Sequence, residues 1–303
     1  MKHRIISLFS LLRYGTQNCH PQINMNRRTF LKTLTGTILH GAVLGVPLHA
    51  ISEAETLHAP SADTDVKDYL HKMQSFNLKH NGDICLKGKQ RDLLESTVNR
   101  LDRIQSLIGH GNFYLAGFDE IINVSKNYSQ IGPFTQDELS FLEEIFYRDA
   151  SEYGFWGDKP YSNITDTINK SKVVKVRGTG NYLYNTDSLD TFKKIKKELG
   201  REVILTSGLR GVAKQFFLFL NKAYHNNANL SLASRSLAPP GYSFHSAGDF
   251  DVGQIDMGGR NFTEDFTRTE VYKKLVDRGY AKLRYKKNNL LGVRFEPWHI
   301  KLG

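Results

Sequence analysis

The C-terminal sequence EPWH, residues 296–299, places a glutamate three positions before a histidine. A second histidine, His245, and two aspartates, Asp249 and Asp251, occur together earlier in the chain. A catalytic zinc ion takes three protein ligands, often two histidines and a carboxylate, and keeps one position open for water. A further carboxylate nearby accepts the proton of that water. The two segments contain this set, and they predict a fold that brings them to one site.

Composition fits an ordinary globular protein, because 40% of the 303 residues are hydrophobic and 24% are charged. This length allows one large domain or two small ones. The net charge is +10, but residues 1–50 contain six basic residues and no acidic one. Without them, 35 basic residues face 31 acidic ones, a net charge of +4. We therefore expect no nucleic-acid partner.

The only cysteines are Cys19 and Cys85, and Cys19 lies in the N-terminal segment. Removal of that segment leaves one thiol, which excludes an intramolecular disulfide and a thiolate metal cluster.

Residues 1–50 have the order of an export signal. Arg27 and Arg28 precede Phe-Leu-Lys, a weakly apolar run follows at residues 34–48, and Ala50 is a candidate cleavage point. The paired arginines resemble a twin-arginine signal, which predicts export to the periplasm or cell envelope. The apolar run is short and interrupted, so we expect no stable membrane span. A retained N-terminal anchor is the alternative, and Met25 is an alternative start.

The middle of the chain predicts a linker at residues 51–66 and a helical subdomain at residues 67–170. Apolar residues spaced by three and four predict a helix over residues 90–108, which ends before Gly109. Thr135 and Glu138 form a capping-box pattern that predicts a second helix. This subdomain is expected to act as a structural buttress or, alternatively, to shape a substrate groove.

Residues 171–303 alternate between strand and helix patterns and predict a catalytic domain. Its strand over residues 249–254 directs Asp249 and Asp251 to the same side. An Asn288-Asn289 turn suggests a hairpin of residues 280–285 and 290–295. The other expected elements are a strand at 173–176, a glycine turn at 177–180, helices at 188–199, 212–224 and 269–278, a strand at 203–206, and a loop at 231–241. Grouped helices followed by antiparallel strands predict an α+β fold, with a small antiparallel sheet and flanking helices behind a helical N-terminal subdomain.

Three blocks in this region resemble a known family. SGLR at 207–210, SFHSAG at 243–248 with Asp251, and EPWH at 296–299 are similar to the signature blocks of the D-alanyl-D-alanine carboxypeptidase and dipeptidase family of zinc peptidases. Their fold is related to the hedgehog signalling domain. The resemblance covers about residues 185–303, and the blocks occur in the family's order.

The resemblance implies one zinc ion and a role for each matching residue. The implied zinc ligands are His245, Asp251 and His299; Glu296 would be the catalytic base, Arg210 would stabilise negative charge, and Ser243 and Gln215 would hold the substrate. The spacing from His245 to the aspartate is one position shorter than is usual in the family, so Asp249 is an alternative ligand. Arg210 could equally bind the substrate's terminal carboxylate, and Glu296 could merely pair with Arg294.

The resemblance also implies the substrate, the peptide stem of bacterial peptidoglycan. The expected activity is zinc-dependent D-alanyl-D-alanine carboxypeptidase. The alternatives are a cross-link endopeptidase, a D,D-dipeptidase, and a zinc-containing peptidoglycan-binding module without turnover. The oligomeric state is not predicted.

Overall fold

The computed structural model describes residues 62–302, with side chains described from Asp68 onward. The predicted signal segment, residues 1–50, and most of the predicted linker lie outside the described residues. The helices are α2 (Ala62–Gln74), α3 (Lys89–Ile108), α4 (His110–Tyr114), α5 (Phe118–Asn127), α6 (Gln136–Tyr147), α7 (Asp187–Leu199), α8 (Val212–Tyr224), α9 (Leu230–Ser234) and α10 (Glu270–Asp277). The strands are β1 (Val173–Lys175), β2 (Tyr182–Tyr184), β3 (Val203–Ser207), β4 (Phe250–Gln254) and β5 (His299–Ile300).

Two helices of the N-terminal region form as their sequences predict. Helix α3 ends before Gly109, whose φ of 84° is in the left-handed region that glycine tolerates. At the start of α6, the Thr135 hydroxyl accepts a hydrogen bond from the Glu138 N–H, and the Glu138 carboxylate accepts one from the Thr135 N–H. The predicted capping box is therefore confirmed. Helix α2 begins at Ala62, inside the range predicted as linker.

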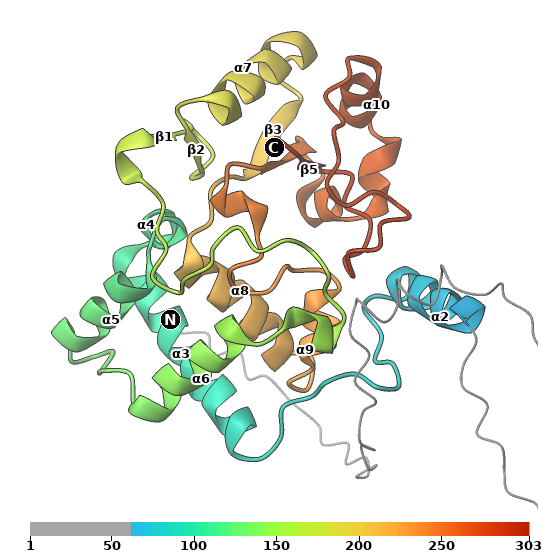
Figure 1. Ribbon diagram of the computed structural model, residues 1–303. Helices are drawn as coiled ribbons and strands as arrows, with labels where there is room; N and C mark the ends of the chain where they lie inside the picture. Colours follow the sequence, from blue (N-terminus) through green and yellow to red (C-terminus); the bar gives the residue numbers. More distant parts are fainter. Residues whose placement is uncertain (1–61, 303) are drawn as a thin grey trace, which may run out of the picture. The chain divides into compact units, whose positions relative to one another are not determined.

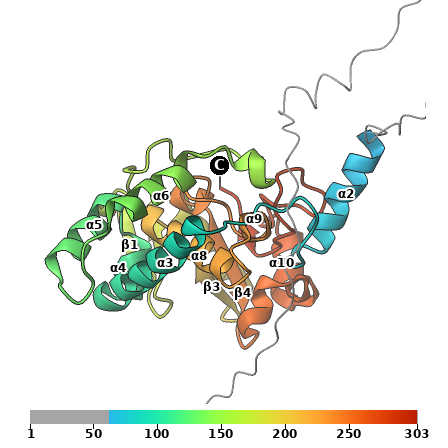
Figure 2. The ribbon, with the colours of Figure 1, turned by 90° about the horizontal axis from the view of Figure 1, so that it is seen from below.

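Helix α8 joins the N-terminal helices to the C-terminal half of the chain (Figure 1). Its bounds agree with the prediction, and Phe216 and Phe219 are fully buried in the larger hydrophobic cluster. Leu94 and Leu101 of α3 belong to the same cluster, and burial of each such side chain contributes roughly 1.5–3 kcal/mol. Viewed from below, α8 lies between α3 and the region of β3 and β4 (Figure 2). The predicted subdomain of residues 67–170 thus shares its core with α8, and the boundary near residue 170 stays a prediction.

A three-stranded antiparallel sheet of order β3-β4-β5 positions the site. Asp251 of β4 is paired with Ser207 of β3 on one side and with His299 of β5 on the other. The sheet packs in a second hydrophobic cluster with α7 and α10, which includes Phe192, Phe250 and Leu275. Small antiparallel sheets flanked by helices confirm the α+β class.

The predicted hairpin of residues 280–285 and 290–295 is wrong. Neither segment is a strand, although Leu283 makes an isolated bridge to Ile300. The backbone N–H of Arg294 donates instead to the Arg235 carbonyl, and that of Glu296 donates to the Tyr285 carbonyl. The backbone bends at several of these residues, and the hydrogen-bond partners come from elsewhere in the chain. The predicted loop at 231–241 also begins with the short helix α9.

The β1–β2 hairpin supports the loop that follows β3. The turn between β1 and β2 contains Gly178 and Gly180, as predicted, both at positive φ. The Leu209 N–H donates to the Tyr182 carbonyl of β2 at 2.8 Å. A Cβ at Gly208 would collide with that carbonyl oxygen, so the close approach requires glycine here. The hairpin thereby fixes the loop between β3 and α8.

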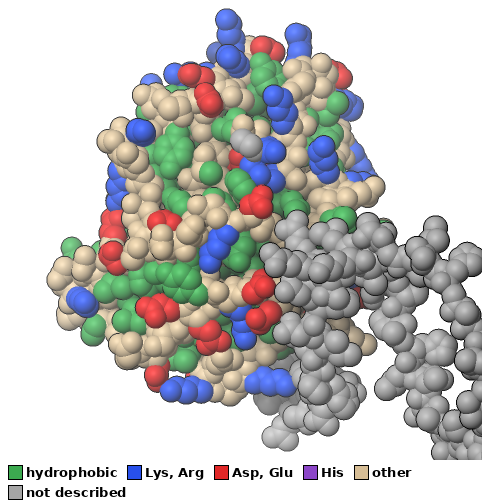
Figure 3. Space-filling view, viewed as in Figure 1, with side chains coloured by type: hydrophobic (Ala, Val, Ile, Leu, Met, Phe, Trp, Pro, Cys, Tyr) green, Lys and Arg blue, Asp and Glu red, His purple; other side chains and the backbone are tan. Residues whose placement is uncertain are grey.

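The described surface mixes charges of both signs. On the face shown in Figure 3, Lys and Arg side chains are interspersed with acidic and apolar ones. Across the helices of residues 62–302, no stretch has the combined length and hydropathy of a membrane span.

Candidate active site

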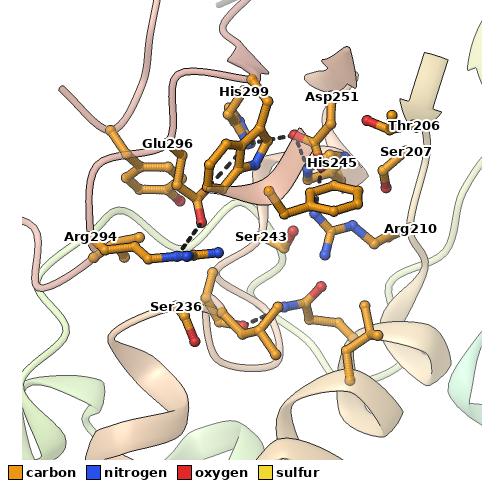
Figure 4. A pocket seen from close by; sticks show the side chains of 18 of the residues that line it. Thr206, Ser207, Arg210, Ser236, Ser243, His245, Asp251, Arg294, Glu296 and His299 are labelled. Atoms are coloured by element: carbon orange, nitrogen blue, oxygen red, sulfur yellow. Dashed lines mark hydrogen bonds and ion pairs between the residues drawn. The ribbon is translucent and has the colours of Figure 1, made fainter. Parts of the chain in front are cut away.

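A pocket of about 300 Å³ lies at the junction of the sheet and α8. Figure 4 shows that side chains from β4, β5, the loop after β3 and the C-terminal segment meet there. All seven residues singled out in the sequence line it: Arg210, Gln215, Ser243, His245, Asp251, Glu296 and His299. The fold therefore brings three sequence blocks to one place.

His245, Asp251 and His299 form a buried group, here named the metal triad. One potential ligand atom from each lies within 4.8 Å of the other two. Asp251 Oδ1 is 3.3 Å from His245 Nε2 and 3.2 Å from His299 Nδ1. Two imidazole nitrogens and one carboxylate oxygen converge, which is the donor set of a catalytic zinc site.

Hydrogen bonds from outside the triad orient both imidazoles. His245 Nδ1 lies 2.8 Å from the Gly208 carbonyl oxygen, which can only accept, so Nδ1 carries the proton. His299 Nε2 lies 3.0 Å from the Asp249 carboxylate and donates to it. Each ring therefore turns its other nitrogen toward Asp251. This is the tautomer that a metal ligand needs, fixed by a carbonyl or carboxylate behind the ring.

Asp249 lies behind His299 and is itself held in place. It accepts hydrogen bonds from the Arg284 guanidinium and from the Leu302 N–H. Its side chain is buried, and burial opposes ionisation, but the contacts with His299 and Arg284 lower its pKa to about 2. Asp249 and Asp251 do lie on the same side, as the strand pattern predicts, and they contact opposite nitrogens of one imidazole. This geometry favours Asp251 as ligand and gives Asp249 a positioning role.

The residues of the triad fit a cation. His245 Nε2 and Asp251 Oδ1 are buried and have no hydrogen-bond partner among the described residues. Buried polar atoms without a partner are costly, and a metal ion bound between these two would remove that cost. Burial alone raises the pKa of Asp251, but the two histidines hold it well below its usual range. The carboxylate is therefore ionised and available as a ligand.

The two imidazoles differ in their electrostatic surroundings. Burial, reinforced by the Arg210 charge, lowers the pKa of His245 to about 4. Burial acts on His299 in the same direction, but the carboxylates of Asp249 and Asp251 outweigh it and raise the pKa of His299 to about 9. The two carboxylates thus favour a positive charge on the His299 ring, and a cation bound between the carboxylates and the rings would be stabilised by the same negative charges.

Glu296 adjoins the triad without belonging to it. Its Oε2 is 3.7 Å from His299 Nδ1, and its Oε1 is 4.0 Å from Arg294 Nε. Burial raises the pKa of Glu296 to about 7. A carboxylate in this position with this pKa is suited to accept and return a proton near neutral pH. Glu296 and Arg294 form an ion pair that is longer than a hydrogen bond, and the base role of Glu296 and its pairing with Arg294 both stay predictions.

Arg210, Gln215 and Ser243 line the opposite part of the pocket. Arg210 Nη2 is 3.8 Å from Asp251 Oδ2, while its Nε is buried without a partner among the described residues. Gln215 donates through Nε2 to the Ala238 carbonyl, and its Oε1 has no described partner. These groups are free to contact a substrate, whereas their predicted roles stay predictions.

Several pocket residues were missed by the sequence reasoning. Tyr285 packs its ring edge-on against His299, with centroids 5.2 Å apart, and Lys222 and Ser236 line the pocket. Asp249 was considered only as an alternative ligand. Its distance of two residues from Asp251 was the one available signal, because it placed both carboxylates on the same side of the strand. Nothing in the local sequence points to Lys222 or Ser236.

Comparisons with known proteins agree with the sequence resemblance. Residues 184–302 match the model of the VanY family, described as D-alanyl-D-alanine carboxypeptidase. This match confirms the resemblance drawn from the three blocks. A search of curated proteins finds no match.

Similar solved structures include vancomycin-resistance enzymes. The D,D-pentapeptidase VanY in complex with Zn(II) is 20% identical, with 49% of this chain and 87% of that chain covered and a TM-score of 0.37. VanYB in complex with D-alanine-D-alanine is 22% identical, with 47% and 82% covered and a TM-score of 0.36. The D,D-dipeptidase VanXYg in complex with a D-Ala-D-Ala phosphinate analogue is 19% identical, with 49% and 61% covered and a TM-score of 0.39.

Proposed function

We propose, from the premise that residues 184–302 carry a VanY-family domain, that this protein is a zinc-dependent D-alanyl-D-alanine carboxypeptidase acting on peptidoglycan stem peptides. The single observation that carries the proposal is the metal triad with Glu296 beside it. A structural zinc site needs four protein ligands and no neighbouring base. Here three ligands converge and a buried carboxylate stands next to them, which favours catalysis.

His245, Asp251 and His299 would hold the zinc ion, which when bound activates water and polarises the scissile carbonyl. Glu296 accepts the proton of the attacking water and then passes it to the leaving amine. Arg210 stabilises the negative charge that develops on the carbonyl oxygen, because its charge is fixed and it lies close to the triad. Ser243 and Gln215 hold the substrate through their hydroxyl and amide groups.

The twin-arginine-type signal supports a location outside the cytoplasm, where peptidoglycan is found. Such a signal is read by a receptor, and the protein would act in the periplasm or cell envelope after export. Its substrate would be a stem peptide that ends in two D-alanines. A cross-link endopeptidase or D,D-dipeptidase would use the same metal site on a different peptide.

Hydrolysis of N-acetyl-L-Gln-D-Ala-D-Ala tests the proposal. We expect the zinc-loaded protein to release D-alanine, and a chelator to stop the release until zinc is restored. Glu296→Gln should keep zinc but lower turnover by about 10²–10⁴-fold, because it removes the proton acceptor. His225→Gln, an exposed histidine, is the control. Zinc binding without release from this or a cross-linked peptide would favour a peptidoglycan-binding module, and full turnover in Glu296→Gln would exclude Glu296 as the base.

A further inference from the structure

Three residues form a separate polar wall of the pocket, here named the basic wall: Lys222, Ser236 and Arg294. Lys222 belongs to α8, and Arg294 lies two residues before Glu296, outside any helix or strand. The Arg294 N–H donates to the Arg235 carbonyl, which places Ser236 beside this segment. Figure 4 shows Arg294 and Arg210 entering the pocket from opposite sides. The catalytic mechanism uses none of the basic-wall residues.

Arg294 is held in place, forms a long ion pair with Glu296, and its Nε lacks a hydrogen-bond acceptor among the described residues. Its guanidinium lies over the rings of Phe76 and Trp298, at 4.5 and 4.8 Å from their centroids. Its Nε is buried without a hydrogen-bond partner among the described residues. The carboxylate of Glu296 is 4.0 Å from this nitrogen, beyond hydrogen-bonding distance. A planar guanidinium fixed by stacking and left without an acceptor is prepared to bind a carboxylate.

Another buried arginine of the same chain shows what a structural role looks like. Arg235 donates to both carboxylate oxygens of Asp83 at 2.8 Å. It also donates to the carbonyls of Phe76 and Leu78. That guanidinium has its hydrogen-bond acceptors within the protein, whereas the Nε of Arg294, which lines the pocket, has none among the described residues. The difference indicates that the acceptor for Arg294 comes with the ligand.

The neighbours of Arg294 point to the same kind of ligand. Lys222 lines the same pocket, where burial and the positive charge of Arg294 lower its pKa. Ser236 is 5% exposed, and its hydroxyl has no described partner. Two cations and one hydroxyl face a space where Glu296 is the nearby carboxylate. An anionic group of the ligand would relieve the repulsion and accept these donors.

The position of the basic wall indicates which part of the substrate reaches it. The Glu296 carboxylate contacts both Arg294 and His299, with Oε1 4.0 Å from Arg294 Nε and Oε2 3.7 Å from His299 Nδ1. An extended residue spans roughly 3.3–3.6 Å, so a group within about two residue lengths of the scissile bond can reach Arg294. Arg210 lies on the other side of the pocket and is available to the terminal carboxylate or the oxyanion. The basic wall is then left for an acid on the acyl side.

We propose that Lys222, Ser236 and Arg294 bind a second carboxylate of the substrate, carried by the residue immediately before the two D-alanines. This rests on the proposed carboxypeptidase function and makes it specific for peptides with an acidic group at that position. A neutral amide in place of the acid leaves Arg294 without its acceptor. The side chains of Lys222, Ser236 and Arg294 therefore determine the preference for a substrate acid over the corresponding amide.

The test compares N-acetyl-L-Glu-D-Ala-D-Ala with N-acetyl-L-Gln-D-Ala-D-Ala, which differ only in acid against amide. We expect kcat/KM to be about 10-fold or more higher for the acid, since a hydrogen bond to a charged group is worth about 1.4 kcal/mol or more. Lys222→Gln and Arg294→Gln should reduce this ratio toward one. Lys193→Gln, an exposed lysine of α7, should keep it. Thermal unfolding checks that each variant is folded.

Equal kcat/KM for the two peptides in the wild type, or an unchanged ratio in both variants, would overturn the proposal. A third peptide, N-acetyl-L-Glu-D-Ala-D-Ala amide, separates the two carboxylates. The wild type is expected to prefer the free terminal carboxylate over this terminal amide. If Lys222→Gln and Arg294→Gln lose that preference instead of the preference for Glu over Gln, the basic wall binds the terminal carboxylate and the proposal fails.

If neither peptide is hydrolysed, the proposed carboxypeptidase function is refuted, but the proposed binding site is not. Calorimetric binding of the acid and amide peptides to the zinc-loaded protein then decides. Tighter binding of the acid by about 10-fold, lost in Arg294→Gln, supports the basic wall. Equal affinities overturn it.

Discussion

The two sides of the pocket differ in how their polar groups are satisfied. On the side of the metal triad, each imidazole is bonded from behind, His245 to the Gly208 carbonyl and His299 to Asp249. Asp249 is held in turn by Arg284. On the basic wall, Arg294 is held by stacking on aromatic rings, and its Nε has no described acceptor.

This difference distinguishes the side chains that are oriented for a metal ion from those that are available to a substrate. A metal ion requires ligands fixed in position and in the correct tautomer before it arrives. A substrate brings its own acceptors, so the groups that bind it are left unpaired in the free protein. The contrast predicts that changes behind the triad weaken metal binding, whereas changes on the basic wall alter the choice of peptide.

The largest effect is expected from loss of a triad ligand. Asp251→Asn removes the negative charge between His245 and His299, and Nδ2 cannot replace an ionised oxygen. We expect zinc affinity to fall by more than about 100-fold, beyond the range of changes behind the ligands, and hydrolysis to be lost. Competition with a chromophoric chelator measures the affinity. Zinc affinity within a few-fold of the wild type would exclude Asp251 as a ligand.

A smaller effect is expected behind the triad. Asp249→Asn keeps the shape of the side chain but removes the charge that orients and polarises His299. The expected loss of zinc affinity is about 10–100-fold, with hydrolysis recovered at high zinc concentration. Asp256→Asn, at an exposed turn after β4, is the matched control. If Asp249→Asn loses more zinc affinity than Asp251→Asn, then Asp249 is the ligand and Asp251 the positioning residue.

The smallest effect concerns the pH dependence of stability in the metal-free protein. Burial raises the pKa of Glu296 from 4.5 to about 7, so the folded state holds a proton that the unfolded chain releases. The contribution of Glu296 to the free energy of unfolding is fully present below about pH 4.5 and is lost as the pH rises through about 7. This contribution amounts to about 3 kcal/mol. Urea unfolding at pH 5 and pH 8 should show this loss in the wild type relative to Glu296→Gln. If the free energy of unfolding changes equally in the two proteins between pH 5 and pH 8, burial does not raise the pKa of Glu296.

Local patterns were enough to predict several elements of the fold. The capping box of Thr135 and Glu138, the helix at residues 212–224 and the strand with Asp249 and Asp251 all depend on residues close together in sequence. Such short-range patterns predict structure because a capping box satisfies the backbone N–H groups of its own helix, and apolar periodicity marks the face that its own element buries. The order of the three sequence blocks then predicted which residues meet in the pocket.

Long-range pairing was not predictable from the same patterns. The backbone N–H groups of Arg294 and Glu296 donate to the carbonyls of Arg235 and Tyr285, and a strand pattern in the sequence cannot identify such partners. The roles of Asp249 and Arg294 depend on the same kind of information. Each is defined by a neighbour, His299 or Trp298, whose orientation only the folded chain fixes.

The position of zinc in the loaded protein tests the central claim most directly. Crystals grown with zinc, measured with anomalous diffraction at the zinc edge, locate the ion without reference to activity. We predict one ion at about 2.0–2.1 Å from His245 Nε2, His299 Nδ1 and an oxygen of Asp251, with Asp249 still bonded to His299 Nε2. Zinc bound to Asp249 instead of Asp251, or bound away from these residues, would contradict the account.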